Sequence, residues 1–271
     1  MSSSRASAGA RLTAGAAARA RLRYLFTTGL RRRLRDLVLA SGGDDAFVVR
    51  EDIARRYLAG SGIEIGAFTW PLRVPRGVSV RYVDQLDREG LLRAYGARIA
   101  EMGLDPASVP ETDVVDDAGR LASFADRSVD FVIASHVLEH IEDPIEALEN
   151  LLRVIRPGGT LLIVLPDPRH TFDAPRPRTS AEHLFRDHNQ GPRASRRGHY
   201  EEWARLNERL PDELVPARVA EFEREDARHH FHVWELPDFV ELLRALELPA
   251  ELALAQSYND EFAIVLRRTP A

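Results

Sequence analysis

The sequence contains no cysteine and only two methionines among its 271 residues. The absence of cysteine excludes disulfide bonds and thiolate metal sites, and it leaves the redox character of the compartment undetermined. Lysine is absent too, so all 37 basic residues are arginine. No apolar run approaches the roughly 20 residues that a membrane-spanning helix needs. With 44% hydrophobic and 29% charged residues, the composition is that of a globular protein. We therefore expect a cytoplasmic protein without a membrane span.

Net charge is unevenly distributed along the chain. Residues 1–40 contain nine arginines and one acid, Asp36, which gives a balance of +8 within a total of −5. The rest of the chain therefore carries −13. Because phosphate binding depends on clustered positive charge, this balance argues against a nucleic-acid partner.

The N-terminal segment itself has three interpretations. Apolar residues from Leu22 to Leu37 recur at about helical spacing, with arginines between them. The helix could pack on the main domain, or it could bind a membrane surface or a partner protein. An organelle-targeting presequence also fits the Arg-rich and acid-poor composition.

Strand and helix patterns alternate in the middle of the chain. Short apolar strands are expected at 63–65, 79–83, 113–116, 131–135 and 160–165, and a pair at 252–257 and 261–267. Helices are expected at 50–59, at 144–155 (where Asp143, Pro144 and Glu146 form a start signal) and at 237–247. Alternating strands and helices predict an α/β fold with a mostly parallel sheet.

Residues 166–230 interrupt this alternation. The stretch is polar and too long for a simple connection, and we expect one helix in it, where His199, Trp203, Leu206 and Leu210 share a face. We divide the chain into a basic extension (1–40), a core (41–166), a substrate-cap insertion (167–230) and the C-terminal part of the core (231–271).

Two stretches resemble a known family. The first is Gly62-Ile63-Glu64-Ile65-Gly66, a short strand that ends in an acid and a glycine. The second runs from Asp126 through Ser135-His136-Val137-Leu138-Glu139-His140 to Pro157-Gly158-Gly159 and a further apolar strand. Together they resemble the class I S-adenosylmethionine (SAM)-dependent methyltransferases, in the small-molecule, type 11-like subgroup. The resemblance implies a Rossmann-like seven-stranded sheet, mostly parallel with an antiparallel last strand, helices on both faces and an insertion after the fifth strand.

The resemblance also implies SAM as cofactor, bound at the carboxyl ends of the strands. Glu64 and Gly66 would face the methionine moiety, Asp84 the ribose and Asp117 the adenine amine, with Asp116 as the competing candidate. Ser135 and His136 would lie under the sulfonium. The cofactor-binding residues expected are Glu64, Gly66, Ala67, Asp84, Asp117, Ala118, Ser135 and His136.

Methyl transfer to a hydroxyl needs a base to remove its proton. The resemblance to sugar O-methyltransferases points to His140 and Asp167, which follow the fourth and fifth strands. His199 is the third catalytic candidate, because its helical face is apolar. The histidines of the insertion could also bind a metal, but without cysteines or an HExxH pattern we expect no metal site. Arginines at 176, 178, 193, 196 and 197 are candidates for binding a phosphate or carboxylate of the substrate.

These features predict a SAM-dependent methyltransferase that acts on a small molecule, with O-methylation of a sugar, glycan precursor or secondary metabolite favoured. The alternative is a SAM-binding regulatory or scaffold protein without turnover, which fits the turn after the first strand, where Gly66 stands in place of the family's usual run of glycines. A nicotinamide oxidoreductase is disfavoured because the first turn lacks G-x-G-x-x-G. A nucleic-acid methyltransferase is disfavoured because no Asn/Asp-Pro-Pro-aromatic clamp follows the fourth strand. The partner expected is a small-molecule acceptor, and a homodimer is left open.

Overall fold

The computed structural model describes residues 46–270. The chain divides into two compact units, residues 1–49 and 50–271, and of the first unit only residues 46–49 are described. Those four residues begin helix α3 (Ala46–Tyr57), whose remaining residues belong to the second unit. The expected basic extension over residues 1–40 lies outside the described residues.

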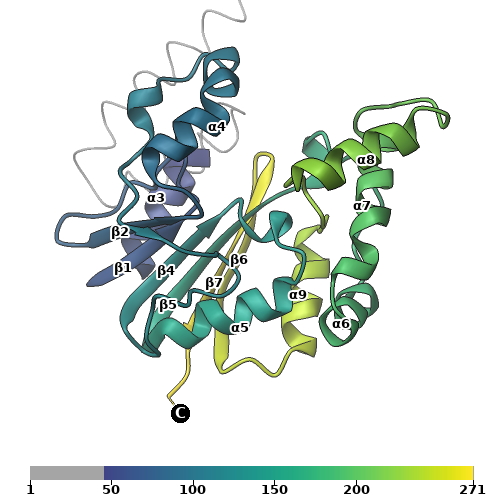
Figure 1. Cartoon of the computed structure of the whole chain (residues 1–271). Helices are drawn as coiled ribbons and strands as arrows, with labels where there is room; N and C mark the ends of the chain where they lie inside the picture. The colour runs from purple at the N-terminus through teal and green to yellow at the C-terminus, as the bar shows by residue number, and fades with distance from the viewer. Residues whose placement is uncertain (1–45, 271) are drawn as a thin grey trace, which may run out of the picture. The chain divides into compact units, whose positions relative to one another are not determined.

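One seven-stranded sheet organises the second unit (Figure 1), with strands in the order β3–β2–β1–β4–β5–β7–β6. The first five strands of this order pair in parallel, and β7 pairs antiparallel to both β5 and β6. The predicted α/β fold, a mostly parallel sheet with an antiparallel last strand, is therefore confirmed. The strands are β1 (Ser61–Ile65), β2 (Ser79–Asp84), β3 (Val114–Val115), β4 (Val129–Ser135), β5 (Ile155–Pro166), β6 (Ala250–Tyr258) and β7 (Glu261–Arg268).

Strands β4 and β5 form the centre of the core. Residues 131–134 of β4 and 160–165 of β5 are continuous buried runs, as expected for strands that are covered on both faces. Helix α5 (Pro144–Val154) packs on the sheet as the predicted amphipathic helix. Asp143 caps it by accepting a hydrogen bond from the backbone N–H of Glu146 at 3.0 Å. The helix ends at Val154, and β5 follows directly at Ile155.

Further helices lie around the sheet. Helix α4 (Arg88–Glu101) connects β2 to β3, and α9 (Leu236–Ala245) precedes the final hairpin. Three short 3-10 helices are described in the connections between elements: η1 (Pro106–Ser108) between α4 and β3, η2 (Leu138–His140) after β4, and η3 (Pro168–His170) after β5. Among residues 46–270, no helix combines the length and the apolar character that crossing a membrane requires.

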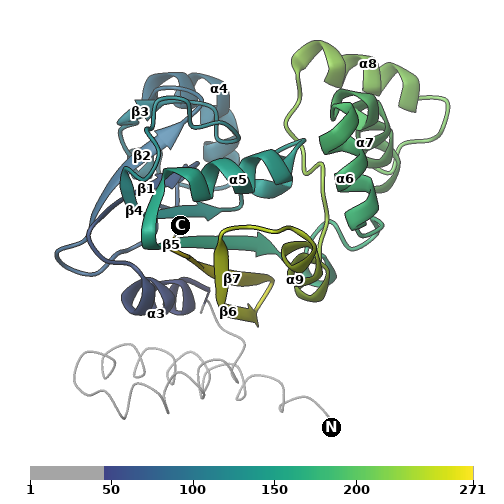
Figure 2. The same ribbon diagram turned by 90° about the horizontal axis from the view of Figure 1, so that it is seen from below.

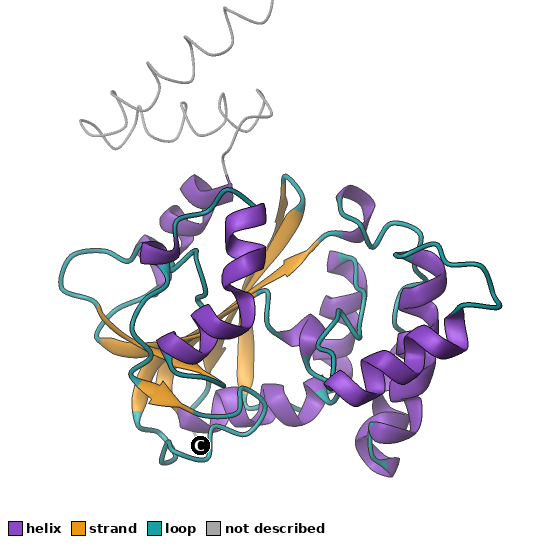
Figure 3. Ribbon diagram, turned by 45° about the horizontal axis from the view of Figure 1, so that its top comes forward, coloured by secondary structure: helices purple, strands orange, loops and turns teal. Residues whose placement is uncertain are grey.

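The insertion after β5 contains three helices where the sequence predicted one. They are α6 (Ala181–Gln190), α7 (Arg193–Leu206) and α8 (Val215–Glu225), and Figures 2 and 3 show them grouped beside α9. Helix α6 was missed because only Leu184 and Asp187 are buried along it, too few for a visible period. We refer to α6, α7 and α8 as the cap helices. Helices α7 and α8 share a small core of their own, made by Tyr200, Ala204, Val215, Val219, Phe222 and Phe231.

Candidate functional site

The carboxyl ends of β1, β2 and β4 lie at one edge of the sheet. Ile65 of β1 pairs with Val83 of β2 on one side and with Ala134 of β4 on the other. Chain order reverses at β1, because β2 follows it on one side and β4 on the other. This is the switch point at which open α/β sheets bind their ligands. The residues predicted to bind the cofactor therefore share one edge of the sheet, which we call the switch-point edge.

Glu64 and Gly66 close the first strand. The carboxylate of Glu64 is buried and accepts the backbone N–H of Leu72 at 2.9 and 3.1 Å. Burial raises the pKa of Glu64 to about 7, although the Leu72 N–H and Arg50 oppose the shift. Gly66 has a φ of +62°, a left-handed conformation that glycine adopts without strain. Ala67 follows, and its carbonyl accepts the N–H of Trp70 at 3.0 Å, so a tight turn leaves the strand.

The two acids after β3, Asp116 and Asp117, accept different numbers of hydrogen bonds. Asp116 accepts hydrogen bonds from the backbone N–H groups of Asp117, Ala122 and Ser123 at 2.8, 3.3 and 2.7 Å, so it holds the turn together. Asp117 is exposed and accepts one N–H, that of Gly119 at 2.9 Å. Asp117 thus has more free acceptor capacity for a ligand than the competing candidate, Asp116.

Asp84 ends β2 at the same edge, and Ala118 lies beyond β3. One oxygen of Asp84 accepts the N–H of Gln85 at 2.8 Å, and burial raises the pKa of the carboxyl group. The methyl group of Ala118 packs against the main core. Both positions agree with the expected ribose and adenine contacts, which stay predictions.

Ser135 is the last residue of β4, and His136 follows it with a φ of +54°. The imidazole of His136 lies between two buried carboxylates, 3.3 Å from Glu139 and 3.0 Å from Glu261. Arg50 pairs with Glu261 and lies 3.0 Å from the Nε2 atom of His136. Burial alone would lower the pKa of His136, but the carboxylates outweigh it and raise the pKa to about 9. A partly buried network of charges therefore lies at this edge of the sheet.

Glu139 leads from this network to a second group of side chains. Its buried carboxylate and the ligand-type atoms of His140 and His230 lie within 4.8 Å of one another. We call Glu139, His140 and His230 the base cluster. Burial would raise the pKa of Glu139, but His136 and the other histidines lower it to about 2, so the carboxylate is charged.

Each histidine of the base cluster has a defined orientation. The Nδ1 atom of His140 lies 3.1 and 3.2 Å from the carbonyl oxygens of Arg228 and His229. Carbonyl oxygens only accept, so Nδ1 donates and Nε2 keeps its lone pair. Burial lowers the pKa of His140, which keeps the ring neutral near pH 7. The Nδ1 atom of His230 lies 2.6 Å from a carboxylate oxygen of Asp173.

Asp173 is held in turn by a buried arginine. The guanidinium of Arg176 has no exposed surface, and it contacts Asp173 at 2.9 Å and Glu202 at 2.8 Å. It also donates to the carbonyl of Phe231 at 3.3 Å. Burial would raise the pKa of Asp173, but His230 and Arg176 lower it. Sequence reasoning missed Asp173 and Glu139, because neither lies in a helical or strand pattern that connects it to a histidine.

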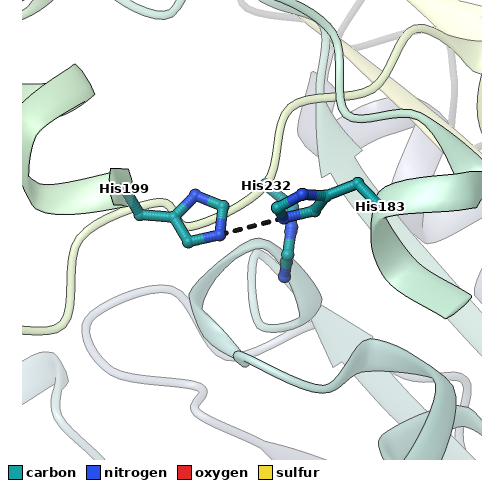
Figure 4. A group of neighbouring side chains, drawn as sticks. All are labelled: His183, His199 and His232. Atoms are coloured by element: carbon teal, nitrogen blue, oxygen red, sulfur yellow. Dashed lines mark hydrogen bonds between the residues drawn. The ribbon is translucent and has the colours of Figure 1, made fainter. Parts of the chain in front are cut away.

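Asp167 and His199 lie in other surroundings. Asp167 is buried at the start of η3 and accepts two hydrogen bonds from the Arg169 side chain, at 2.9 and 2.5 Å. This pairing lowers the pKa of Asp167. No hydrogen bond joins Asp167 to His140 within residues 46–270. His199 instead meets His183 and His232 (Figure 4). Their catalytic roles stay predictions.

Comparison with known proteins gives one family match. Residues 77–163 match the family described as a methyltransferase domain, a range that begins before β2, ends within β5 and leaves out β1. Two relatives carry the description uncharacterized methyltransferase. One, from Mycolicibacterium gilvum (strain PYR-GCK), is 33% identical over 107 residues, which are 34% of this chain and 42% of the relative. The other, from Mycobacterium sp. (strain KMS), is 40% identical over 63 residues, which are 23% and 25% of the two chains. The chain thus spans less than half the length of these curated relatives.

Solved structures with a similar arrangement include SAM-dependent methyltransferases. One from Aquifex aeolicus has a TM-score of 0.44 and 13% identity, covering 90% of this chain and all (100%) of that one. One from Methanosarcina mazei has a TM-score of 0.42 and 16% identity, covering 80% and 96%. The match over residues 77–163 and the strand order together confirm the resemblance to the class I SAM-dependent methyltransferases that was drawn from the sequence.

Proposed function

We propose that this chain transfers a methyl group from SAM to a hydroxyl oxygen of a small molecule, such as a sugar, a glycan precursor or a secondary metabolite. The observation that carries the proposal is an unbroken series of side-chain contacts from the switch-point edge to the base cluster. His136 at the edge contacts Glu139, and Glu139 lies beside His140 and His230. A bound methyl donor and a proton acceptor would therefore lie in adjoining parts of one site.

The residues at the edge fit SAM. Glu64 offers a buried carboxylate for the ammonium group, and the turn at Gly66 lets the backbone pass close to a ligand. Asp84 ends β2 at this edge, and a carboxylate in that place can accept hydrogen bonds from ribose hydroxyls. When bound, SAM supplies a methyl group on a sulfonium, so the protein needs to position the acceptor and remove its proton.

His140 has the properties of that proton acceptor. Its Nδ1 atom donates to backbone carbonyls, so the ring is fixed in the tautomer that leaves Nε2 free. A neutral imidazole with a defined lone pair is the common general base in enzymes. Asp167 is the weaker candidate, because Arg169 holds its carboxylate and lowers its pKa.

His230 is the positioning partner of the base. Its Nδ1 atom faces Asp173, and its ring lies edge-on against His140 with 4.6 Å between centroids. Asp173 fixes the orientation of His230, and Arg176 fixes Asp173. This chain of contacts restricts the rotation of His140, which must lie within hydrogen-bonding distance of the acceptor hydroxyl.

The charges of the cap favour an acceptor without a phosphate group. Of the five arginines considered for phosphate binding, four pair with carboxylates: Arg176 pairs with Asp173 and Glu202, and Arg178 pairs with Asp238. Arg196 and Arg197 also pair with carboxylates, those of Glu142 and Glu223 among them. Guanidinium groups that already bind carboxylates are poorly suited to a second anion. A hydroxylated, uncharged acceptor is therefore favoured.

Two measurements test the proposal. Calorimetric titration with SAM and S-adenosylhomocysteine, with NAD as negative control, tests the cofactor site. Transfer of labelled methyl from SAM to a panel of sugars, phenols and amines, analysed by mass spectrometry, tests the reaction. Binding of both SAM compounds with label on a hydroxyl supports the proposal. Binding without label in any acceptor favours a regulatory or scaffold protein, and label on amines alone refutes the O-methyl assignment.

A further inference from the structure

Three histidines that are distant in the sequence converge between the cap helices and the segment before α9. His183 lies in α6, His199 in α7, and His232 in the extended stretch that leads to α9. Their ligand-type nitrogens all lie within 4.8 Å of one another. Figure 4 shows the three rings meeting, with a nitrogen of His232 beside the contact between the other two. This cluster has no part in the proposed methyl transfer.

The spacing suits a shared metal ion. The Nε2 atoms of His183 and His199 are 3.2 Å apart. Two imidazole ligands at about 2.0–2.1 Å from a tetrahedral zinc ion place their nitrogens about 3.3 Å apart. The pair therefore needs almost no rearrangement to bind one ion together.

The buried Nδ1 atom of His232 is a second sign of a metal site, independent of the spacing between His183 and His199. Its Nε2 atom lies 3.2 Å from the carbonyl oxygen of Glu142, which can only accept, so Nε2 carries the proton. The Nδ1 atom then has a bare lone pair, and it is buried without a hydrogen-bond partner. Metal-bound histidines typically donate their second N–H to a carbonyl or carboxylate in this way. A buried acceptor without a partner is otherwise costly.

The protonation states also agree with metal binding, because a histidine must be neutral to bind an ion. Burial lowers the pKa of His232 well below its usual value of 6.5. Burial, with His183 and Arg176 nearby, lowers the pKa of His199 to about 4. Both rings are therefore neutral near pH 7. The charge of Arg176 is offset by its pairs with Asp173 and Glu202.

The surroundings of His183 provide both a competitor and a further oxygen. Arg186, which is exposed, lies 3.0 Å from the Nδ1 atom of His183. When Nε2 of His183 binds the ion, Nδ1 carries the ring proton and no longer accepts a hydrogen bond, so the Arg186 side chain would turn toward solvent. An oxygen of Asp187 lies 3.1 Å from the Nε2 atom. Asp187 is buried and also accepts from the hydroxyl of Ser195.

We propose that His183, His199 and His232 bind one divalent transition-metal ion of the Zn²⁺ type. Imidazole nitrogens suit this class of ion better than they suit Mg²⁺ or Ca²⁺. The fourth position is left for water or an oxygen of Asp187. The ion joins α6 and α7 to the segment before α9. Because His230 lies in that segment, the ion also holds α6 and α7 in position relative to His230.

The test is calorimetric titration of the full-length, tag-free, chelator-treated protein with Zn²⁺ alone. We expect one ion per chain, and affinity at least about 10-fold weaker in His183→Gln and His199→Gln, since even outer-sphere changes cost 10–100-fold. His188→Gln is the matched control, because His188 also lies in α6 but pairs with Asp143. That variant should bind Zn²⁺ as the parent does.

Two results would overturn the proposal. In the first, the parent binds Zn²⁺ no more tightly than the double variant His183→Gln/His199→Gln. In the second, His230→Gln abolishes binding while the α6 and α7 variants keep it, which would place the ion at the base cluster. Far-UV circular dichroism of each variant checks that it is folded. His199→Gln is the decisive variant, because His199 is only partly buried and its replacement should disturb the fold little. None of these readouts depends on SAM or on an acceptor, so they stand apart from the proposed methyl transfer.

Discussion

Arg176→Met should strongly destabilise the protein. The guanidinium has no exposed surface, and its partner Asp173 has 2% of its side chain exposed. Removing Arg176 leaves the buried Asp173 with His230 as its remaining partner, and breaking a buried ion pair costs about 3–5 kcal/mol. Total stabilities of domains are about 5–15 kcal/mol, so the loss is a large part of the whole. The contacts with Glu202 and the Phe231 carbonyl are lost as well.

Urea denaturation followed by circular dichroism measures this loss. Arg197→Met is the matched control, because Arg197 is half exposed and pairs with Glu223 at 3.0 Å on the cap surface. Exposed pairs contribute about 0–1 kcal/mol, so the control should unfold near the parent's midpoint. A loss below about 1 kcal/mol for Arg176→Met, or one equal to the control's, would refute the reasoning. It would mean that Asp173 keeps its charge without the arginine or gives it up at little cost.

Three further predictions concern the site. His140→Gln should lower turnover by roughly 10²–10⁴-fold and leave SAM affinity unchanged in calorimetry, whereas unchanged turnover would remove His140 from the reaction. The pH profile of kcat/KM should show an acid limb below pH 6.5, because burial lowers the pKa of His140 and the neutral ring is the active form; a limb above pH 7 would exclude this histidine. Glu64→Gln should weaken SAM binding and flatten the dependence of stability on pH. The folded pKa of Glu64 is raised to about 7 from 4.5, so the folded state retains a proton that the unfolded state has lost, and the parent's stability should fall as pH rises between these values. An identical slope in parent and variant would contradict that assignment.

The sheet was predictable because its signals are local. Strands β4 and β5 are apolar runs bounded by turn residues, and α5 begins with Asp143 and Pro144 before a regular apolar face. Burial of such segments requires partners on both sides, which leaves few arrangements of the chain. The cap helices were harder to predict. Helix α6 buries only two residues, and its position depends on contacts with α5, α7 and α9.

The two histidine clusters could not be assembled from the sequence. His140 and His230 are 90 residues apart, and no periodicity relates them. His183 and His199 lie on different helices, whose relative rotation is decided by the packing of the cap. Periodic patterns group residues within one element, while contacts between elements depend on tertiary packing. The histidines were visible as candidates, but their grouping was not.

The segment at 230–233 connects the core to the cap, and this explains why so many polar contacts gather there. The backbone N–H of Phe231 donates to the carbonyl of Glu139 at 2.7 Å, next to the switch-point edge. His230 reaches Asp173, His232 reaches Glu142, and Val233 pairs with Thr179 through its backbone. A shift of this one segment would therefore move the proposed base partner and the proposed metal ligand together. Metal binding at the cap should for that reason tighten the orientation of His230, and hence of His140, even though the ion touches neither ring.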